Sequence, residues 1–388
     1  MKTWHADRLS KLPPYLFVEI DRKKRAARAA GRDIIDFGVG DPDQPTHRFI
    51  IERMSVAIGD PANHRYAQGI GSREFRETAA DYFRKRFDVA LDPESEIIAL
   101  VGTKEGLGHL PTAVVDPDDT VLIPDPGYPV YEAGTIFAGG KCHFMPLREE
   151  SQWLPRLAEI PSEVRRRVRL MYLNYPNNPT GACAPRSFFE EAVAFAREHG
   201  FLIAQDAAYA ELCFGEPPPS MLSIAGAKEV CIEFHSLSKT FNMTGWRVGF
   251  AAGNANALVA LAKVKSNVDS GVFGAVQQAG IEGLRNIGRS EIKAQMDLYR
   301  RRRDVLVHGL REAGWRVATP QATFFVWARC PEGLDSMTTA TRLLDEIDVV
   351  AIPGSGFGKG GEGYIRFALT VDEDRIHEAM RRLAAWRA

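Results

Sequence analysis

Short apolar runs alternate with helical stretches along most of this chain, and that alternation restricts the fold more than any other feature. The pattern starts near Asn63 and ends near Ala252. One helical stretch, Ser187–His199, carries its apolar residues on one face. Alternating strands and helices predict an α/β fold in which helices cover both faces of a mostly parallel sheet. The expected strands are Ile97–Val101, Thr120–Ile123, Lys141–Met145, Val168–Asn174, Phe201–Gln205, Val230–Phe234 and Arg247–Ala252.

The sequence changes in character after Gly271, which predicts a second, smaller domain. A long helical stretch, Ala275–Gly314, comes first, and a helix over Asp372–Trp386 closes the chain. Between these helices, strands of an α+β domain are expected at Trp315–Ala318, Thr323–Ala328, Val349–Ile352 and Tyr364–Leu369. A length of 388 residues also favours two cores over one. We expect an N-terminal arm and the start of the small domain in 1–45, the large domain in 46–285 and the small C-terminal domain in 286–388.

Composition argues against several classes of function. The formal net charge is −1, so no bulk attraction to nucleic acid or to an anionic membrane is expected. The five cysteines lack C-x-x-C spacing and the nine histidines contain no H-E-x-x-H motif, so neither a disulfide framework nor a metal site is predicted. No run approaches the about 18 apolar residues of a membrane span, and the N-terminus has no apolar signal core. A cytoplasmic location is expected.

Lys239 is the strongest candidate for a reactive side chain. It comes just after an apolar run, beside Ser236 and Ser238, and Arg247 starts the next run. Burial at a strand end lowers the pKa of a lysine and frees its amine as a nucleophile, while hydroxyls and an arginine can hold a phosphate. An amine next to a phosphate site predicts an aldehyde-bearing phosphorylated cofactor held as a Schiff base, namely pyridoxal phosphate. The alternative is a surface lysine in a turn rich in Ser and Thr.

Two further segments are candidates for contact with such a cofactor. Thr103 and Lys104 follow Gly102 at the start of an expected helix, where free N–H groups would face an anion. Tyr128 lies in Asp125-Pro-Gly-Tyr-Pro-Val-Tyr131, where prolines restrict its ring and favour stacking on a flat ligand. Each segment also has a plain structural interpretation, as an ordinary strand–helix turn or as a packing aromatic.

Polar side chains end two of the expected strands. Asn174–Gly181 contains two prolines, a glycine and three asparagines, a rigid loop from which Asn178 could donate a hydrogen bond to a ring oxygen. A half-buried carboxylate at Asp206 needs a cationic partner, and the pyridinium nitrogen of the cofactor would be one. That contact keeps the ring protonated and therefore able to accept electrons. Tyr209 could reach the same ring oxygen as Asn178.

Arg366 stands in the otherwise apolar stretch Tyr364–Leu369. A guanidinium on a buried strand is costly unless it pairs bidentately with a carboxylate. Arg366 therefore needs an acidic partner.

Taken together and in this order, these residues resemble the fold type I, pyridoxal-phosphate-dependent aminotransferases of class I/II over nearly the whole chain. The most specific motifs are Asn-Pro-Thr-Gly at 178–181, Asp-x-x-Tyr at 206–209, and Ser-Leu-Ser-Lys with Gly-Trp-Arg between 236 and 247. The resemblance implies a large domain with a mostly parallel seven-stranded sheet, a smaller α+β domain, and a homodimer with shared active sites. It also implies transfer of an amino group between an amino acid and a 2-oxo acid such as 2-oxoglutarate.

The resemblance implies a role for each candidate residue. Lys239 would form the Schiff base and move the proton, and Asp206 would pair with the ring nitrogen. Tyr128 would stack on the ring, and Arg366 would bind the substrate α-carboxylate. Contacts to the ring oxygen are implied for Tyr209 and Asn178. Contacts to the phosphate are implied for Thr103, Lys104, Ser236, Ser238, Arg247 and, from the neighbouring subunit, Tyr66.

At finer grain the sequence looks like the LL-diaminopimelate aminotransferases, in segments such as Leu-Pro-Pro-Tyr-Leu-Phe, Gly-Val-Gly-Asp-Pro-Asp and Lys-Ser-Asn-Val-Asp-Ser-Gly. That likeness makes LL-2,6-diaminopimelate the leading amino donor. It implies further substrate contacts from Tyr15, Gly40 and, across the dimer, Asn267. The family usually has Glu or Tyr where Gly69 stands and Ser where Thr103 stands. The first difference removes a candidate contact to the distal end of the substrate.

Several alternatives stay open. The donor could be aspartate, alanine, an aromatic amino acid or a specialised metabolite. The enzyme could also be a lyase or oxidase of the same fold, because the cofactor alone does not decide which bond breaks. Ser236-x-x-Lys239 matches the S-x-x-K of serine acyl-enzymes, but neither S-D-N nor K-T-G follows. A regulator that senses amines with this fold would carry a DNA-binding module, for which no residues are spare.

Overall fold

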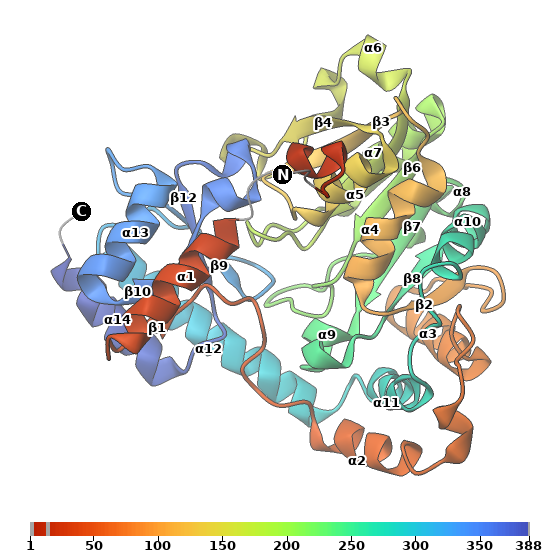
Figure 1. Cartoon of the computed structure of the whole chain (residues 1–388), viewed down its shortest axis with the longest axis horizontal. Coiled ribbons are helices and arrows are strands. Elements are labelled where there is room, and N and C mark those ends of the chain that lie inside the picture. The colour runs from red at the N-terminus through yellow and green to blue at the C-terminus, as the bar shows by residue number, and fades with distance from the viewer. Residues whose placement is uncertain (1–3, 13–15, 387–388) are drawn as a thin grey trace.

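Seven strands form the central sheet in a computed structural model that describes residues 4–12 and 16–386 (Figure 1). Their order across the sheet is β2-β8-β7-β6-β5-β3-β4, and only β8 runs antiparallel to its neighbours. The mostly parallel seven-stranded sheet is thus confirmed, each strand within one or two residues of its expected range. The bounds are β2 Ile97–Leu100, β3 Thr120–Asp125, β4 Lys141–Pro146, β5 Val168–Asn174, β6 Leu202–Asp206, β7 Cys231–Ser236 and β8 Gly249–Gly253.

Helices cover both faces of this sheet because its side chains alternate between two apolar layers. Strand β5 shows the alternation: Leu170 and Tyr172 belong to one layer, and Met171 and Leu173 belong to the other. The helices of the first layer are α4 (Thr103–Val114), α5 (Val130–Ala138) and α10 (Ala255–Lys265). Those of the second layer are α2 (Arg48–Ala57), α3 (Arg73–Phe87), α7 (Arg186–His199) and α11 (Gly274–Arg285).

Three neighbouring strands bring the polar residues of the sequence motifs to one edge of the sheet. Asp206 is the last residue of β6 and lies between Asn174 of β5 and Phe234 of β7. Ser236 ends β7, and Lys239 follows at once on the one-turn helix α9 (Leu237–Thr240). Because β5, β6 and β7 are parallel, their carboxyl ends meet where ligands of such sheets bind.

A second sheet, antiparallel and three-stranded in the order β11-β12-β9, forms the core of the C-terminal region. Its strands are β9 Phe325–Arg329, β11 Ile352–Pro353 and β12 Tyr364–Ala368, and helices α12 (Ser290–Glu312), α13 (Ser336–Ile347) and α14 (Glu373–Ala385) surround them. The expected strand at 315–318 is wrong: Val317 makes only an isolated bridge to Ala328. The chain reaches Pro320 just beyond, and proline has no N–H with which to continue a ladder.

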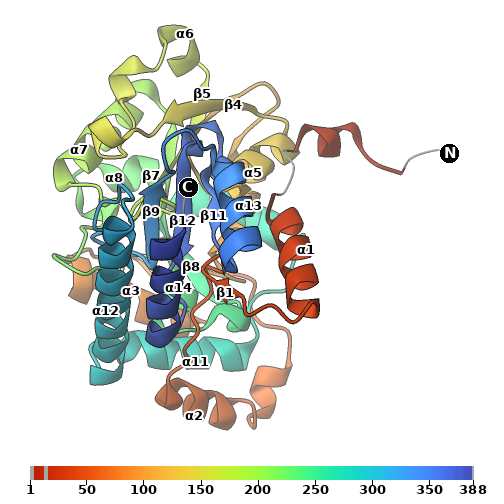
Figure 2. The same cartoon turned by 90° about the vertical axis from the view of Figure 1, so that its left-hand side faces the viewer.

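The N-terminal helix α1 (Leu16–Ala29) packs against this C-terminal region, next to α13 (Figure 2). Ala27 of α1 contacts Leu344 of α13 and Val350 of β10 (Val349–Val350) in a small apolar cluster. β10 in turn pairs in parallel with β1 (Ile35–Asp36). The segment that follows β1, residues 37–45, passes the carboxyl end of β7, where the Gly40 carbonyl accepts from Lys239 and the Pro45 carbonyl accepts from Asn242. Within the ranges described above, no helix is long and apolar enough to cross a membrane.

Candidate active site

A cavity of about 620 Å³ opens at the carboxyl edge of the large sheet and is closed on its other side by the C-terminal region. Most of the residues singled out from the sequence line it, although they come from segments far apart in the chain. They are Gly40, Thr103, Lys104, Tyr128, Asn178, Asp206, Tyr209, Ser236, Lys239 and Arg366. Several separate motifs therefore make one site.

Lys239 lies inside this cavity, and its side chain is half-buried. Its Nζ donates a hydrogen bond to the Gly40 carbonyl at 3.1 Å and lies 5.6 Å from the centre of the Phe324 ring. Burial lowers the pKa of Lys239 to about 8, and the nearby guanidinium groups of Arg247 and Arg366 act in the same direction. A lowered pKa leaves more of the amine in its neutral form, which is the form that acts as a nucleophile or a base.

Asp206 is buried at the end of β6, only 5% exposed. Its Oδ2 accepts a hydrogen bond from the Tyr131 hydroxyl at 2.7 Å, and its Oδ1 accepts one from the Ala208 N–H at 3.1 Å. Burial raises the pKa of Asp206 to about 6, although both hydrogen bonds lower it. No lysine, arginine or histidine of the described residues forms an ion pair with this carboxylate, so its position suits a cationic group on a ligand.

The N-terminus of α4 lies at the cavity, and Thr103 and Lys104 of its first turn are among the lining residues. The N–H groups of a first helical turn have no partner within the helix and are suited to binding an anion. Gly102 precedes the helix at φ +74°, and the Arg247 guanidinium lies so close that a β-carbon at Gly102 would collide with it. Arg247 itself does not line the cavity, but this contact places its positive charge beside the helix start. A glycine, a helix N-terminus and a guanidinium together form a site for an anion such as phosphate.

Arg366 enters the cavity from β12 and is 4% exposed. Nη1 donates to Asn178 Oδ1 at 3.0 Å and Nη2 donates to the Gly38 carbonyl at 3.1 Å, while Nε has no partner among the described residues. The guanidinium lies 4.1 Å from the centre of the Phe325 ring. No carboxylate in the described part of the chain pairs with it. Its position in the cavity suits a carboxylate on a ligand.

The family model for aminotransferase class I and II matches residues 32–383, nearly the whole chain. The chain belongs to the class I and II aminotransferases. Among curated proteins, the LL-diaminopimelate aminotransferase of Syntrophobacter fumaroxidans is 52% identical over 379 residues, 97% of each chain. The LL-diaminopimelate aminotransferase of Aquifex aeolicus is 49% identical over 379 residues, 97% of this chain and 98% of its own.

Solved structures agree with this family and with fold type I. Substrate-bound BacF from Bacillus subtilis has a TM-score of 0.95 and 34% identity, and the match covers 99% of this chain and 98% of BacF. A probable N-succinyldiaminopimelate aminotransferase from Thermus thermophilus has a TM-score of 0.90 and 36% identity, with 95% of this chain and 99% of that chain covered. An aspartate aminotransferase variant from Thermus thermophilus gives a TM-score of 0.93 at 29% identity, covering 99% of this chain and 100% of its own.

Aminotransferases of this family depend on pyridoxal 5′-phosphate, and the cavity of this aminotransferase fits that cofactor. Lys239 offers an enclosed amine of lowered pKa for the aldehyde. Asp206 is a buried carboxylate with no cationic partner in the described ranges, as the ring nitrogen requires. The start of α4 offers N–H groups and the Arg247 charge for the phosphate. Bound there, the cofactor supplies an electron sink for the substrate α-carbon.

Three more of the expected cofactor contacts line the same cavity. Asn178 Oδ1 accepts a hydrogen bond from Arg366 Nη1, which leaves the Asn178 Nδ2 amide to donate to a ligand. The backbone N–H of Asn178 is held by Asn174 Oδ1 at 2.8 Å, and Asn174 Nδ2 donates to the Asp206 carbonyl, also at 2.8 Å. Tyr209 is buried, which raises the pKa of its hydroxyl and keeps it a donor. Tyr128 lies at the start of the cavity wall formed by α5.

Other expected site residues do not reach this cavity. Ser238 is buried but does not line it. Tyr66 is 92% exposed, and the exposed Asn267 turns its Nδ2 to the Lys263 carbonyl at 2.8 Å. Both therefore lie outside the site of their own chain. Tyr15 falls outside the described residues.

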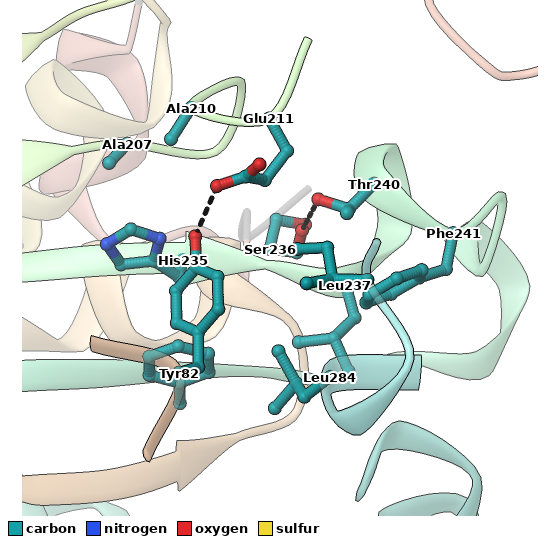
Figure 3. A pocket seen from close by; sticks show the side chains of 12 residues that line it. Tyr82, Ala207, Ala210, Glu211, His235, Ser236, Leu237, Thr240, Phe241 and Leu284 are labelled. Carbon is teal, nitrogen blue, oxygen red and sulfur yellow. Dashed lines mark hydrogen bonds between the residues drawn. The ribbon is translucent and has the colours of Figure 1, made fainter. Parts of the chain in front are cut away.

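A second layer of polar contacts supports the strand ends from behind (Figure 3). The Tyr82 hydroxyl donates to Glu211 Oε1 at 2.6 Å, and the Thr240 hydroxyl donates to the Ser236 carbonyl at 3.3 Å. Arg86 Nε also donates to Glu211 Oε1, at 3.0 Å. The cavity between these groups is only about 10 Å³, room for about one water. Its lining includes Ala207 and Ala210 from the segment after Asp206, and Ser236 and Thr240 from the segment around Lys239.

Sequence reasoning missed Tyr131 and the two phenylalanines that face Lys239 and Arg366. Tyr131 belongs to the same short motif as Tyr128, which precedes α5, and the two rings pack edge-on. Their closeness in the motif is the one signal that could have pointed to Tyr131. Phe324 and Phe325 stand in a predicted strand, where aromatic residues are usual and carry no separate signal. The structure explains why position 40 is a glycine: a β-carbon there would lie 2.9 Å from Phe325 Cζ, too close for a larger residue.

Proposed function

We propose that this aminotransferase moves the amino group of LL-2,6-diaminopimelate to a 2-oxo acid such as 2-oxoglutarate. The observation that carries the reaction type is the pairing, in one cavity, of an enclosed amine at Lys239 with the Arg366 guanidinium, which has no carboxylate partner among the described residues. An amino acid needs both: the guanidinium binds its α-carboxylate and the amine acts at its α-carbon. The LL-diaminopimelate donor is supported by the curated relatives, which bear that activity in their names at about half identity.

The side chains around the cavity would have distinct roles in the proposed reaction. Arg366 binds the α-carboxylate of the donor through its guanidinium and orients the α-carbon toward Lys239. Lys239 Nζ would take the proton from that carbon and deliver it two bonds away, on the far side of the amino nitrogen, since its pKa of about 8 lies near the working pH. The carboxylate of Asp206 holds a proton on the cofactor ring nitrogen, while Tyr209 and Asn178 donate to the ring oxygen.

The remaining assignments belong to the same proposal. The phosphate would be bound by Thr103, Lys104, Ser236, Ser238 and Arg247 together with the partner's Tyr66, and the substrate would also contact Tyr15, Gly40 and the partner's Asn267. We infer a homodimer with shared sites, because Tyr66 and Asn267 lie outside their own cavity. We also propose that the chain divides into an N-terminal arm with the start of the small domain (1–45), a large domain (46–285) and a small C-terminal domain (286–388). A cytoplasmic location is proposed as well, and the five unpaired cysteines support it, because disulfides are rare in that compartment.

Gly69 should set the preference among amino donors. A β-carbon at Gly69 meets no atom within 4 Å, so a side chain fits there without strain. We expect Gly69→Glu to raise kcat/KM for LL-diaminopimelate about tenfold or more, because a carboxylate would pair with the distal ammonium at about 1.5–3 kcal/mol. Steady-state rates for LL-diaminopimelate, glutamate, aspartate and alanine against 2-oxoglutarate would measure this.

Two control variants separate donor selectivity from general binding. Gly69→Gln has the same size without the charge and should give little of the gain. Arg366→Lys should lower turnover for every donor alike, because all donors present the same α-carboxylate. If the wild-type enzyme turns over aspartate, glutamate or alanine but not LL-diaminopimelate, the donor is wrong and the aminotransferase activity alone stands.

Mixed dimers should reveal whether two chains share each site. Chains with Tyr66→Phe mixed with chains carrying Lys239→Ala should regain activity, because one site of each hybrid would contain both native side chains. Random pairing in equal amounts would make about one quarter of all sites native. A mixture of Ser236→Ala with Lys239→Ala is the matched control: both lesions lie in the chain's own site, so no native site can form. Equal activity in both mixtures would exclude sharing.

A further inference from the structure

Tyr131 contacts the cofactor-binding carboxylate from outside the cavity. Its side chain is fully buried on α5, it does not line the cavity, and its hydroxyl donates to Asp206 Oδ2 at 2.7 Å. Tyr131 has no direct contact with cofactor or substrate in the proposed reaction. The Tyr131 hydroxyl can therefore affect the reaction only through Asp206, whereas the Tyr131 ring also packs against Tyr128, which lines the cavity.

Aromatic stacking fixes the Tyr131 ring. The ring stacks on Tyr172 of β5 with centroids 4.5 Å apart and an angle of 18° between the planes, and the Tyr128 ring packs edge-on at 5.8 Å. The Tyr172 hydroxyl in turn donates to the Leu107 carbonyl of α4 at 2.7 Å. A ring held on both sides leaves its hydroxyl little freedom, so the hydrogen bond to Asp206 has a fixed direction.

The hydrogen bonds at Asp206 divide its carboxylate into a held part and a free part. Oδ1 accepts from the Ala208 N–H and Oδ2 accepts from Tyr131. A carboxylate has about four acceptor sites, so about two remain for a ligand. Hydrogen bonds donated to the carboxylate favour its ionised form, whereas burial favours its neutral form. The titratable side chains that interact with Asp206 are Tyr131, Tyr172, Tyr209, His235 and Lys239.

We propose that Tyr131 is a positioning residue of the transamination site: its hydroxyl keeps Asp206 ionised and aimed at the ring nitrogen of the cofactor. The proposal rests on the pairing of Asp206 with that nitrogen. The donors to the Asp206 carboxylate in the described structure are the Ala208 N–H and the Tyr131 hydroxyl. The second belongs to a side chain, so a substitution can remove it without altering the backbone. Without its hydrogen bond the carboxylate would be desolvated with one fewer donor, and the pKa of Asp206 would rise.

The test compares Tyr131→Phe with Tyr172→Phe in the holoenzyme. Each variant removes one buried hydroxyl from the same stacked pair, but only Tyr131 contacts Asp206. We expect kcat to fall about 10–100-fold in Tyr131→Phe with KM nearly unchanged, in line with the loss of a hydrogen bond to a charged group. The acid limb of the kcat–pH profile should move to higher pH in Tyr131→Phe and stay in place in Tyr172→Phe. Equal profiles in the two variants would overturn the proposal.

A cofactor analogue supplies a readout besides turnover. In 1-deazapyridoxal phosphate a carbon replaces the ring nitrogen, so Asp206 has no cation to bind. By calorimetry, cofactor-free Tyr131→Phe should bind pyridoxal phosphate more weakly than the wild type does, and should bind the deaza analogue equally well. If the wild type itself does not distinguish the two cofactors, the Asp206 pairing fails. If it does and Tyr131→Phe distinguishes them equally well, only the role of Tyr131 fails.

An unnatural residue keeps the proposal testable even if Tyr131→Phe folds poorly. 3-Fluorotyrosine at position 131 keeps the ring and the hydroxyl but makes the phenol a stronger donor. The acid limb of the kcat–pH profile should then move to lower pH, opposite to its movement in Tyr131→Phe. No shift, or a shift to higher pH, would contradict the proposed hydrogen-bond control of Asp206.

Discussion

Lys239→Ala should abolish transamination and leave a protein that binds its cofactor only non-covalently. The expected loss in kcat is several orders of magnitude, more than the about 10²–10⁴-fold contributed by a positioned proton-transfer group, because the nucleophile disappears with it. The lysine contributes one hydrogen bond, to the Gly40 carbonyl, and its burial is itself unfavourable for the charged form. The fold should therefore tolerate the change.

Borohydride reduction followed by peptide mass spectrometry measures the attachment directly. The wild-type enzyme should carry reduced cofactor on Lys239, and Lys104→Ala is the matched control, since Lys104 lines the same cavity but is exposed at the start of α4. Cofactor capture by the cofactor-free enzyme should accelerate as pH rises through about 8, the pKa of the buried amine. Reduced cofactor on Lys104, or on any other lysine, would refute the assignment.

The sequence predicted the large sheet well because its signal is local. Each strand is a short apolar run between helices, and such runs identify themselves without knowledge of their neighbours. The failed strand at 315–318 shows the limit: its residues have strand character, but Val317 finds a single partner in Ala328. Whether an edge segment pairs depends on the path of the chain around it, here toward Pro320, and not on its own composition.

The candidate site was predictable where one residue type implies its partner. A lysine after a strand end, an acid at the neighbouring strand end and an arginine on an apolar strand were each expected to contact a ligand, and the structure places all three around one cavity. Contacts made by common residues were not predictable. Tyr131 resembles any buried helical tyrosine until Asp206 is placed beside it, and the Arg366–Asn178 hydrogen bond joins segments that belong to different sheets.

Asp206→Asn should retain the cofactor and lose most of the rate. The amide is the same size: its Oδ1 can still accept from the Ala208 N–H, and its Nδ2 can donate to the Tyr131 hydroxyl, which can also act as an acceptor, so the change removes charge with little change of shape. Without a carboxylate the ring nitrogen is not held protonated and no longer withdraws electrons from the substrate α-carbon. A lost electrostatic contribution of about 4 kcal/mol corresponds to about a thousandfold drop in kcat.

The stability of the cofactor-free protein provides a control for this prediction. The raised pKa of Asp206 means that its charge disfavours folding, so a loss of kcat in Asp206→Asn would not reflect a less stable fold. Burial raises the pKa of Asp206 to about 6, so its charged form is disfavoured in the folded state, and its contribution to stability is lost as pH rises through about 6. Cofactor-free Asp206→Asn should therefore be no less stable than the wild type above that pH. Glu211→Gln alters another acid of the same segment, which pairs with Arg86 and Tyr82 behind the cavity, and it should lower the melting temperature more than kcat. An Asp206→Asn enzyme with near-native kcat would mean that this carboxylate, unfavourable for folding, serves some purpose other than holding the ring proton.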